Sequence, residues 1–147
     1  MARILIADDD PQVLRTLAEV VKALGHEIQT APDGRQALEY FFAGSFDLVL
    51  TDLAMPEVDG LQVLNRVKAA RPSTGVIVLT GNSTMELLAA AINRGVDAYI
   101  TKPFKISEID SQLCRVLAKY ASPEPKAEPA PEPRKKGLAA WLTSVLS

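Results

Sequence analysis

Cysteine is almost absent from this 147-residue chain. Its single cysteine, Cys114, cannot form an intramolecular disulfide. No apolar run reaches the roughly 18 residues of a membrane-spanning helix. The opening MARILIADDD has only a short apolar run that ends in charge, unlike a signal peptide. These absences predict a soluble, cytoplasmic protein.

A surplus of charge of one sign is also lacking. Lysine and arginine number 16 against 18 aspartate and glutamate residues, a formal net charge of −2. Nucleic-acid binding usually requires a basic face, so DNA is not expected as a partner. His26 and Cys114 have no neighbours at metal-ligand spacing, and we expect both to be structural.

Strand and helix patterns alternate five times between residues 3 and 120, within a chain that is 48% hydrophobic. Short apolar runs predict strands over residues 3–7, 27–31, 48–51, 75–80 and 98–100. Apolar residues at helical spacing predict helices over residues 11–24, 34–42, 60–70, 85–94 and 107–120. Asp10 is expected to cap the first helix and Ser83 or Thr84 the fourth. Five strand–helix units with short connections predict a parallel sheet covered by helices on both faces.

Charged residues follow three of these predicted strands directly. Asp8 and Asp9 follow ILIA, Asp52 follows LVLT, and Lys102 follows AYIT. Because the carboxyl ends of parallel strands meet at one edge of a sheet, these side chains should share a crevice. Three crowded carboxylates repel one another, so we expect a hard divalent cation such as Mg²⁺ between them.

These residues form part of a longer pattern. Its members are Asp8-Asp9, the block Asp52-Leu53-Ala54-Met55-Pro56 followed by Asp59-Gly60, Thr80, Tyr99, and Lys102-Pro103-Phe104. The pattern resembles the receiver domain of bacterial two-component response regulators, over about residues 1–121. The resemblance implies a flavodoxin-like, doubly wound α/β fold, with five parallel strands in the order 2-1-3-4-5 and five helices.

The resemblance also implies a phosphorylation-dependent switch. Asp52 would accept a phosphoryl group from a histidine kinase or a phosphotransfer protein. Asp9, and Asp8 through a water, would hold Mg²⁺ together with Asp52 and the backbone carbonyl of Ala54. Phosphotransfer and dephosphorylation would be self-catalysed, so the protein is not expected to be an enzyme with turnover.

Four further residues take roles by the same resemblance. Lys102 would place its ammonium against the phosphoryl oxygens, aimed by a cis peptide bond to Pro103. The Thr80 hydroxyl would move to the new phosphoryl group, and Tyr99 would turn inward into the vacated space. Phosphorylation would thereby alter the surface of the fourth helix, fifth strand and fifth helix.

Two small residues beside the acceptor bear on the lifetime of the phosphorylated state. Ala54 follows Asp52 by two positions, and Gly81 directly follows Thr80. Both leave room for a phosphodonor, but Ala54 offers no group to orient an attacking water. The expectation is ready phosphotransfer with moderate, unassisted hydrolysis.

Two other functions on the same fold require residues that this chain lacks. A Mg²⁺-dependent phosphatase with an aspartate nucleophile would need a second aspartate where Ala54 stands. A flavin or nucleotide carrier would need a glycine-rich loop after the first strand, where the chain has acidic residues. A receiver-like binding module that works without phosphorylation remains the main alternative.

The composition changes abruptly beyond Tyr120. Residues 122–136, SPEPKAEPAPEPRKK, predict an extended and mostly disordered linker. Residues 137–147 predict a short amphipathic docking helix with one apolar stripe, formed by Leu138, Trp141, Leu142 and Val145. So short a helix needs a surface to bind, such as a groove on another protein, a membrane surface or the receiver itself.

The expected output therefore runs through protein partners. An unknown downstream protein would dock on residues 137–147 or on the surface of the fourth helix, fifth strand and fifth helix, and a homodimer through that surface stays open. No DNA contact is expected.

Overall fold

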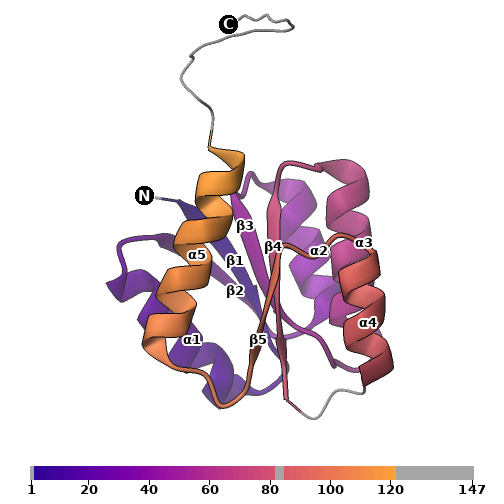
Figure 1. Ribbon diagram of the computed structural model, residues 1–147, viewed down its shortest axis with the longest axis horizontal. Helices are drawn as coiled ribbons and strands as arrows, with labels where there is room; N and C mark the ends of the chain where they lie inside the picture. The colour runs from indigo at the N-terminus through magenta and orange to yellow at the C-terminus, as the bar shows by residue number, and fades with distance from the viewer. Residues whose placement is uncertain (1, 82–84, 122–147) are drawn as a thin grey trace, which may run out of the picture.

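The computed structural model describes residues 2–81 and 85–121 (Figure 1). The predicted linker 122–136, the predicted docking helix and its stripe of Leu138, Trp141, Leu142 and Val145 lie outside the described residues. The predicted cap of the fourth helix at Ser83 or Thr84 lies outside them as well.

A single sheet of five parallel strands forms the centre of the molecule. The strands are β1 (Arg3–Ala7), β2 (Glu27–Ala31), β3 (Leu48–Asp52), β4 (Gly75–Thr80) and β5 (Ala98–Thr101). Their order is β2-β1-β3-β4-β5, which confirms the predicted fold class. Two strands run one residue further than predicted, because Asp52 still pairs with Leu79 and Thr101 with Thr80.

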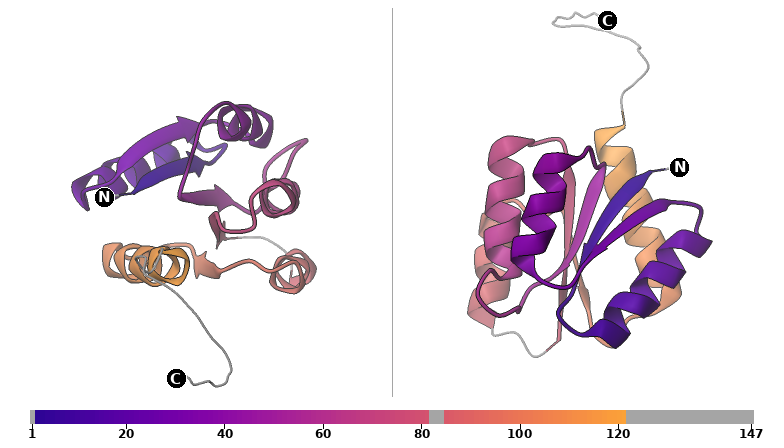
Figure 2. Two further views of the ribbon diagram at one scale, coloured as in Figure 1. Left: turned by 90° about the horizontal axis from the view of Figure 1, so that it is seen from above. Right: turned by 180° about the vertical axis from the view of Figure 1, so that it is seen from behind.

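Helices cover both faces of the sheet (Figures 1 and 2). In the described residues they are α1 (Pro11–Ala23), α2 (Gly34–Ala43), α3 (Gly60–Ala70), α4 (Met85–Asn93) and α5 (Ile106–Tyr120). Alternate residues of a strand point to opposite faces, so Ile4 and Ile6 pack with α1 and α5, whereas Leu5 and Ala7 pack with α2, α3 and α4. The core therefore has two layers, separated by the sheet.

Local signals define most helix boundaries. Asp10 caps α1 as predicted, and its carboxylate accepts hydrogen bonds from two backbone N–H groups of the first turn. Asp59 forms a capping box with Gln62 at the start of α3. Gly25 and Gly95 adopt left-handed φ values of 99° and 86° just beyond α1 and α4. Both helices end one residue earlier than predicted, at Ala23 and Asn93.

No helix in the described ranges is long and apolar enough to cross a membrane.

Candidate metal and phosphoryl site

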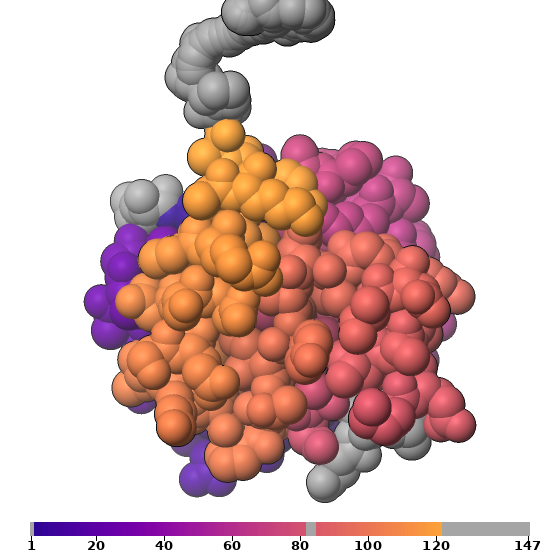
Figure 3. Space-filling model, viewed as in Figure 1, coloured from indigo at the N-terminus to yellow at the C-terminus, as the bar shows by residue number. Residues whose placement is uncertain are grey.

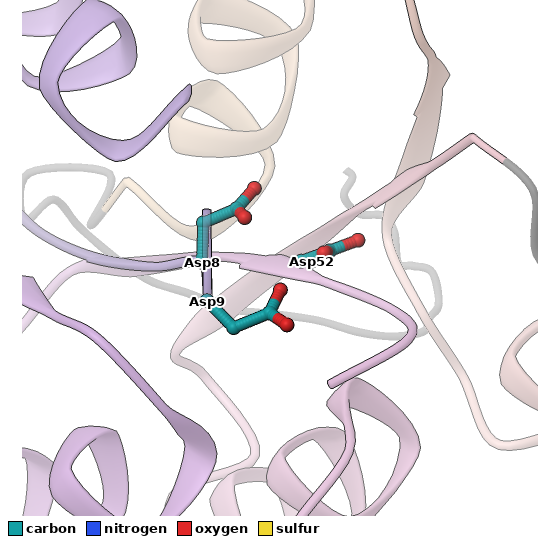
Figure 4. Close-up of side chains that lie close together, drawn as sticks. All are labelled: Asp8, Asp9 and Asp52. Atoms are coloured by element: carbon teal, nitrogen blue, oxygen red, sulfur yellow. The ribbon is translucent and has the colours of Figure 1, made fainter. Parts of the chain in front are cut away.

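Three carboxylates converge at the carboxyl end of the sheet (Figure 4). Asp8 follows β1, Asp52 ends β3, and the two strands are hydrogen-bonded neighbours. Asp8, Asp9 and Asp52 each offer one carboxylate oxygen, and these oxygens lie within 4.8 Å of one another. Asp8 and Asp52 are buried, whereas Asp9 is exposed. Oxygen atoms this close, from three acidic groups, suit a hard divalent cation.

Lys102 directly follows β5, and its side chain reaches into the same site. Its ammonium lies 3.2 Å from Oδ2 of Asp8 and 3.4 Å from Oδ2 of Asp52. The backbone N–H of Lys102 donates to the carbonyl of Thr80, and the peptide bond to Pro103 is cis. The resulting pocket has a volume of about 630 Å³. It is lined by Asp8, Asp9, Asp10, Asp52, Ala54, Gly81, Lys102 and Pro103.

The surroundings of Asp52 favour its neutral form when no cation is bound. Burial raises the pKa of its carboxyl to about 6, and the nearby charge of Asp8 adds to the rise. Lys102 and the backbone N–H of Ala54 offset part of this effect. Burial alone would lower the pKa of the Lys102 ammonium, but the charges of Asp52 and Asp8 outweigh it, so that pKa is raised.

The loop after Asp52 is held tightly in place. The N–H of Leu53 donates to the carbonyl of Leu79 at 2.8 Å, and the N–H of Gly60 donates to the carbonyl of Leu53 at 2.9 Å. A side chain at position 60 would collide with the carbonyl oxygen of Asp52. Within the loop, Glu57 adopts a φ of 65°, a conformation that non-glycine residues rarely take. The sequence marked Gly60 as part of the family pattern, but its contact with the Asp52 backbone is visible only in the structure.

The two proposed switch residues lie on neighbouring strands but in different surroundings. Thr80 is buried at the end of β4, next to Gly81 on the pocket wall. Tyr99 lies on β5, and 46% of its surface is exposed. The structure thus brings the three aspartates and Lys102 together, with Ala54 on the pocket wall and Tyr99 outside the pocket.

A third buried carboxylate, Asp97, lies outside the pocket, just before β5, and no role was predicted for it from the sequence. Its side chain accepts hydrogen bonds from Lys68 at 2.8 Å, from Lys119 at 2.7 Å, from the hydroxyl of Tyr120 at 2.7 Å and from the N–H of Val76 at 2.9 Å. Burial would raise the pKa of Asp97, but these hydrogen bonds outweigh it and the pKa is lowered. The cluster joins α3, β4 and α5, and its only sequence signal is an aspartate beside a buried strand.

Known proteins share both the sequence pattern and the fold. Residues 4–113 match the response regulator receiver domain family. The chain is 34% identical over 122 residues to the DNA-binding transcriptional regulator NtrC of Azospirillum brasilense, covering 83% of this chain and 25% of that protein. It is 32% identical over 123 residues to the transcriptional regulatory protein TcrA of Mycobacterium tuberculosis, covering 84% of this chain and 49% of TcrA.

Solved structures agree with this relationship. A CheY-like response regulator receiver domain protein from Methanospirillum hungatei superposes with a TM-score of 0.78 at 28% identity, over 82% of this chain and 96% of that chain. A response regulator receiver domain protein from Clostridium thermocellum gives a TM-score of 0.77 at 27% identity, over 81% and 96% of the two chains.

The partner prediction made from the sequence, an output through docking proteins and without DNA, is wrong. A matched relative is named as DNA-binding, and this chain spans only about a quarter to a half of the curated relatives' length. The net charge of the chain does not reveal this output, because the basic face that contacts DNA can lie in a different part of a protein from its receiver domain. A net charge of −2 on these 147 residues therefore does not exclude a DNA-binding output.

The acidic cluster, the lysine beside it, the parallel five-stranded fold and the family match lead to one identification. The chain belongs to the response regulator receiver domain family of two-component signalling, whose members accept a phosphoryl group on an aspartate and bind Mg²⁺ in an acidic pocket.

Proposed function

We propose that Asp52 is the residue that accepts the phosphoryl group, and that its phosphorylation is the signalling event. The burial and contacts of the three carboxylates support this choice. Asp8 is fully buried, with one oxygen accepting from the N–H of Asp10 at 2.9 Å and the other paired with Lys102. Asp9 is exposed at the rim. Asp52 lines the pocket beside Lys102, where an incoming phosphoryl group can reach its carboxylate.

The transfer reaction is a displacement at phosphorus. A carboxylate oxygen of Asp52 forms the new bond to phosphorus while the donor's bond to phosphorus breaks, and the donor group keeps the electron pair. The Lys102 ammonium, already 3.4 Å from this carboxylate, provides positive charge for the phosphoryl oxygens. Asp8, Asp9, Asp52 and the carbonyl of Ala54 would hold a Mg²⁺ ion, which supplies further positive charge to the same oxygens. A kinase of two-component signalling is the proposed donor.

The proposed response to phosphorylation involves Thr80 and Tyr99. The Thr80 hydroxyl would donate a hydrogen bond to a phosphoryl oxygen on Asp52, and its movement would leave space beside β5. The side chain of Tyr99, about half exposed in this structure, would turn into that space. The surface around Tyr99 would then differ between the two states.

The lifetime of the phosphorylated state is proposed to depend on Ala54 and Gly81. Both line the pocket without a polar side chain, so neither can orient a water for attack on the acyl phosphate. Ala54 likewise offers no general acid, so sustained phosphatase turnover has no support in this pocket.

Mass spectrometry of the intact protein tests the proposal. The wild type, Asp52→Asn and Asp10→Asn would each be incubated with Mg²⁺ and acetyl phosphate. Asp10 also lines the pocket, but its carboxylate caps α1 and is not part of the acidic cluster, which makes it a matched control.

We expect one added phosphoryl group on the wild type and on Asp10→Asn, removable by hydroxylamine, and none on Asp52→Asn. A phosphoryl group that persists on Asp52→Asn would contradict the assignment. Absence of phosphorylation in every variant, with Mg²⁺ binding established, would instead favour a module that works without phosphorylation.

A further inference from the structure

An apolar groove is lined by residues of α2, of α3 and of the loop before α3. Helices α2 and α3 lie on the face of the sheet opposite α5 (Figure 2). Its walls include Leu38 and Phe42 of α2 and Val58 of the loop before α3, and its volume is about 410 Å³. A smaller depression of about 190 Å³ continues it along α3 and shares Leu38, Val58 and Arg66. Phe42 is 46% exposed although it is a large aromatic residue. The groove is thus a ready site for apolar side chains.

The rim of this groove carries cationic charge. The guanidinium of Arg66 lies 5.8 Å from the centre of the Phe42 ring. Within residues 2–81 and 85–121, Arg66 has no carboxylate within ion-pair distance, whereas Arg35 is paired with Glu39 at 2.9 Å. An aromatic side chain bound next to Phe42 would also lie close to this guanidinium, which favours aromatic faces.

The groove also touches the loop that carries the phosphoryl site. Val58 lies between Asp52 and α3, and the start of α2 packs so closely on it that a side chain at Gly34 would collide with the Val58 carbonyl. A segment bound against Val58 would therefore contact the loop whose other end holds Asp52 and Ala54.

The end of α5 contacts the last turn of α3, one of the two helices that line the groove. The hydroxyl of Tyr120 lies 2.9 Å from the ammonium of Lys68 in α3. The guanidinium of Arg71, directly after α3, donates at 3.1 Å to the carbonyls of both Phe41 and Gly44 at the end of α2. The last turn of α3 therefore bridges from α5 to α2, and Phe42 is adjacent to Phe41.

Residues 122–136 number fifteen, and at the extended spacing of about 3.1 Å per residue they reach about 46 Å.

We propose that residues 137–147 bind in the α2–α3 groove of their own chain, with Leu138, Trp141, Leu142 and Val145 facing Leu38, Phe42 and Val58. The apolar stripe matches apolar walls. The linker reaches about 46 Å, which exceeds the length of the 11-residue α3, about 16 Å at about 1.5 Å per residue. A short linker gives an effective concentration of about millimolar, so a weak intrinsic affinity is sufficient for docking. Docking of this kind restrains Val58 and so couples the C-terminal segment to the loop after Asp52.

The alternative surface is the depression between α4 and α5 over β5, which belongs to the face shown in Figure 3. It is lined by Glu108, Gln112 and Arg115 as well as by apolar residues. Burying these polar groups under an apolar stripe would cost their hydration. The lining surface of the α2–α3 groove is mostly apolar, whereas about half of the lining surface of this depression is polar, so the groove is the better match.

Trp141 is the only tryptophan of the chain, so its fluorescence reports directly on this segment. The full-length wild type would be compared with Phe42→Glu and with Ile92→Glu, a control that places the same charge at an exposed apolar position on α4. Phe42 and Ile92 are similarly exposed, at 46% and 52% respectively. Emission maximum and acrylamide quenching would be recorded over a range of protein concentrations, with far-UV circular dichroism to check folding.

We expect a blue-shifted, protected Trp141 in the wild type and in Ile92→Glu, independent of concentration. Loss of an aromatic anchor should weaken docking by about 30-fold, so Phe42→Glu should show the emission of water-exposed tryptophan. If that variant does not fold, Phe42→Ala should give the same red shift.

Three results would overturn the proposal. Emission of water-exposed tryptophan in the wild type would show that Trp141 is not docked. A red shift in Ile92→Glu with none in Phe42→Glu would assign the segment to the α4 face. A blue shift that appears only at high protein concentration or on adding anionic lipid vesicles would assign it to a second copy or to a membrane.

Discussion

Replacing Asp52 with asparagine should stabilise the protein when no divalent cation is present. The pKa of Asp52 rises from 3.8 to about 6 on folding, mainly through burial and then through the charge of Asp8. A shift of roughly two units corresponds to about 3 kcal/mol at about 1.4 kcal/mol per unit. Asparagine removes this unfavourable ionisation, but the open pocket lets solvent screen part of the effect, so the expected net gain is about 1–2 kcal/mol.

The stability difference between the wild type and Asp52→Asn should depend on pH. Because the pKa of Asp52 is higher in the folded state, the folded protein binds more protons than the unfolded chain between about pH 4 and pH 6. The contribution of Asp52 to the free energy of unfolding should therefore fall as the pH rises through this range and stay low above it. The advantage of Asp52→Asn should be full at pH 8 and should shrink toward pH 4.

Urea unfolding in EDTA, followed by far-UV circular dichroism at pH 8, 6 and 4.5, measures this difference. The two proteins should share one m-value, so that the change in midpoint reports stability alone. A less stable Asp52→Asn at pH 8, or a difference that does not change with pH, would refute the electrostatic reasoning.

Three further predictions concern other parts of the molecule. Mg²⁺ at a hundred times its dissociation constant should stabilise the wild type by about 2.7 kcal/mol, measured as a rise in Tm, and Asp9→Asn should lose most of this gain. Asp97→Asn should destabilise the fold by about 3 kcal/mol, because it leaves Lys68 without its buried partner, whereas Lys119→Ala, at an exposed position, should cost clearly less in the same urea titration. Gly60→Ala should cost at least about 2 kcal/mol and abolish acetyl-phosphate labelling, since the new methyl group collides with the Asp52 carbonyl.

The outcomes that contradict these predictions are specific. An equal Tm response of wild type and Asp9→Asn to Mg²⁺ would remove Asp9 from the metal site. A stability difference between wild type and Asp97→Asn that does not shrink on acidification would contradict the lowered pKa of Asp97, since a carboxylate with a lowered pKa stabilises the fold only while ionised. Normal labelling of Gly60→Ala would show that the loop can shift without harm.

The order of strands and helices could be predicted because it depends on local periodicity and chain direction. Apolar runs, helical spacing and capping residues such as Asp10 act over a few positions, and the boundaries differed from expectation by about one residue. The differences arose at strand ends such as Asp52 and Thr101, where pairing with a neighbouring strand extends the element. Local sequence does not contain that information.

The residues gathered at the phosphoryl site were also predictable, since parallel strands place their carboxyl ends at one edge. What each residue does there depends on burial and on distances between residues far apart in the chain. Asp8 and Asp9 are neighbours in sequence, yet one is fully buried against Lys102, 94 positions away, and the other is exposed. The raised pKa of Asp52, the Asp97 cluster and the collision that requires glycine at position 60 arise in the same way. Residue type and spacing determined which groups meet, whereas the dielectric surroundings and close packing that tune them exist only once the tertiary structure has formed.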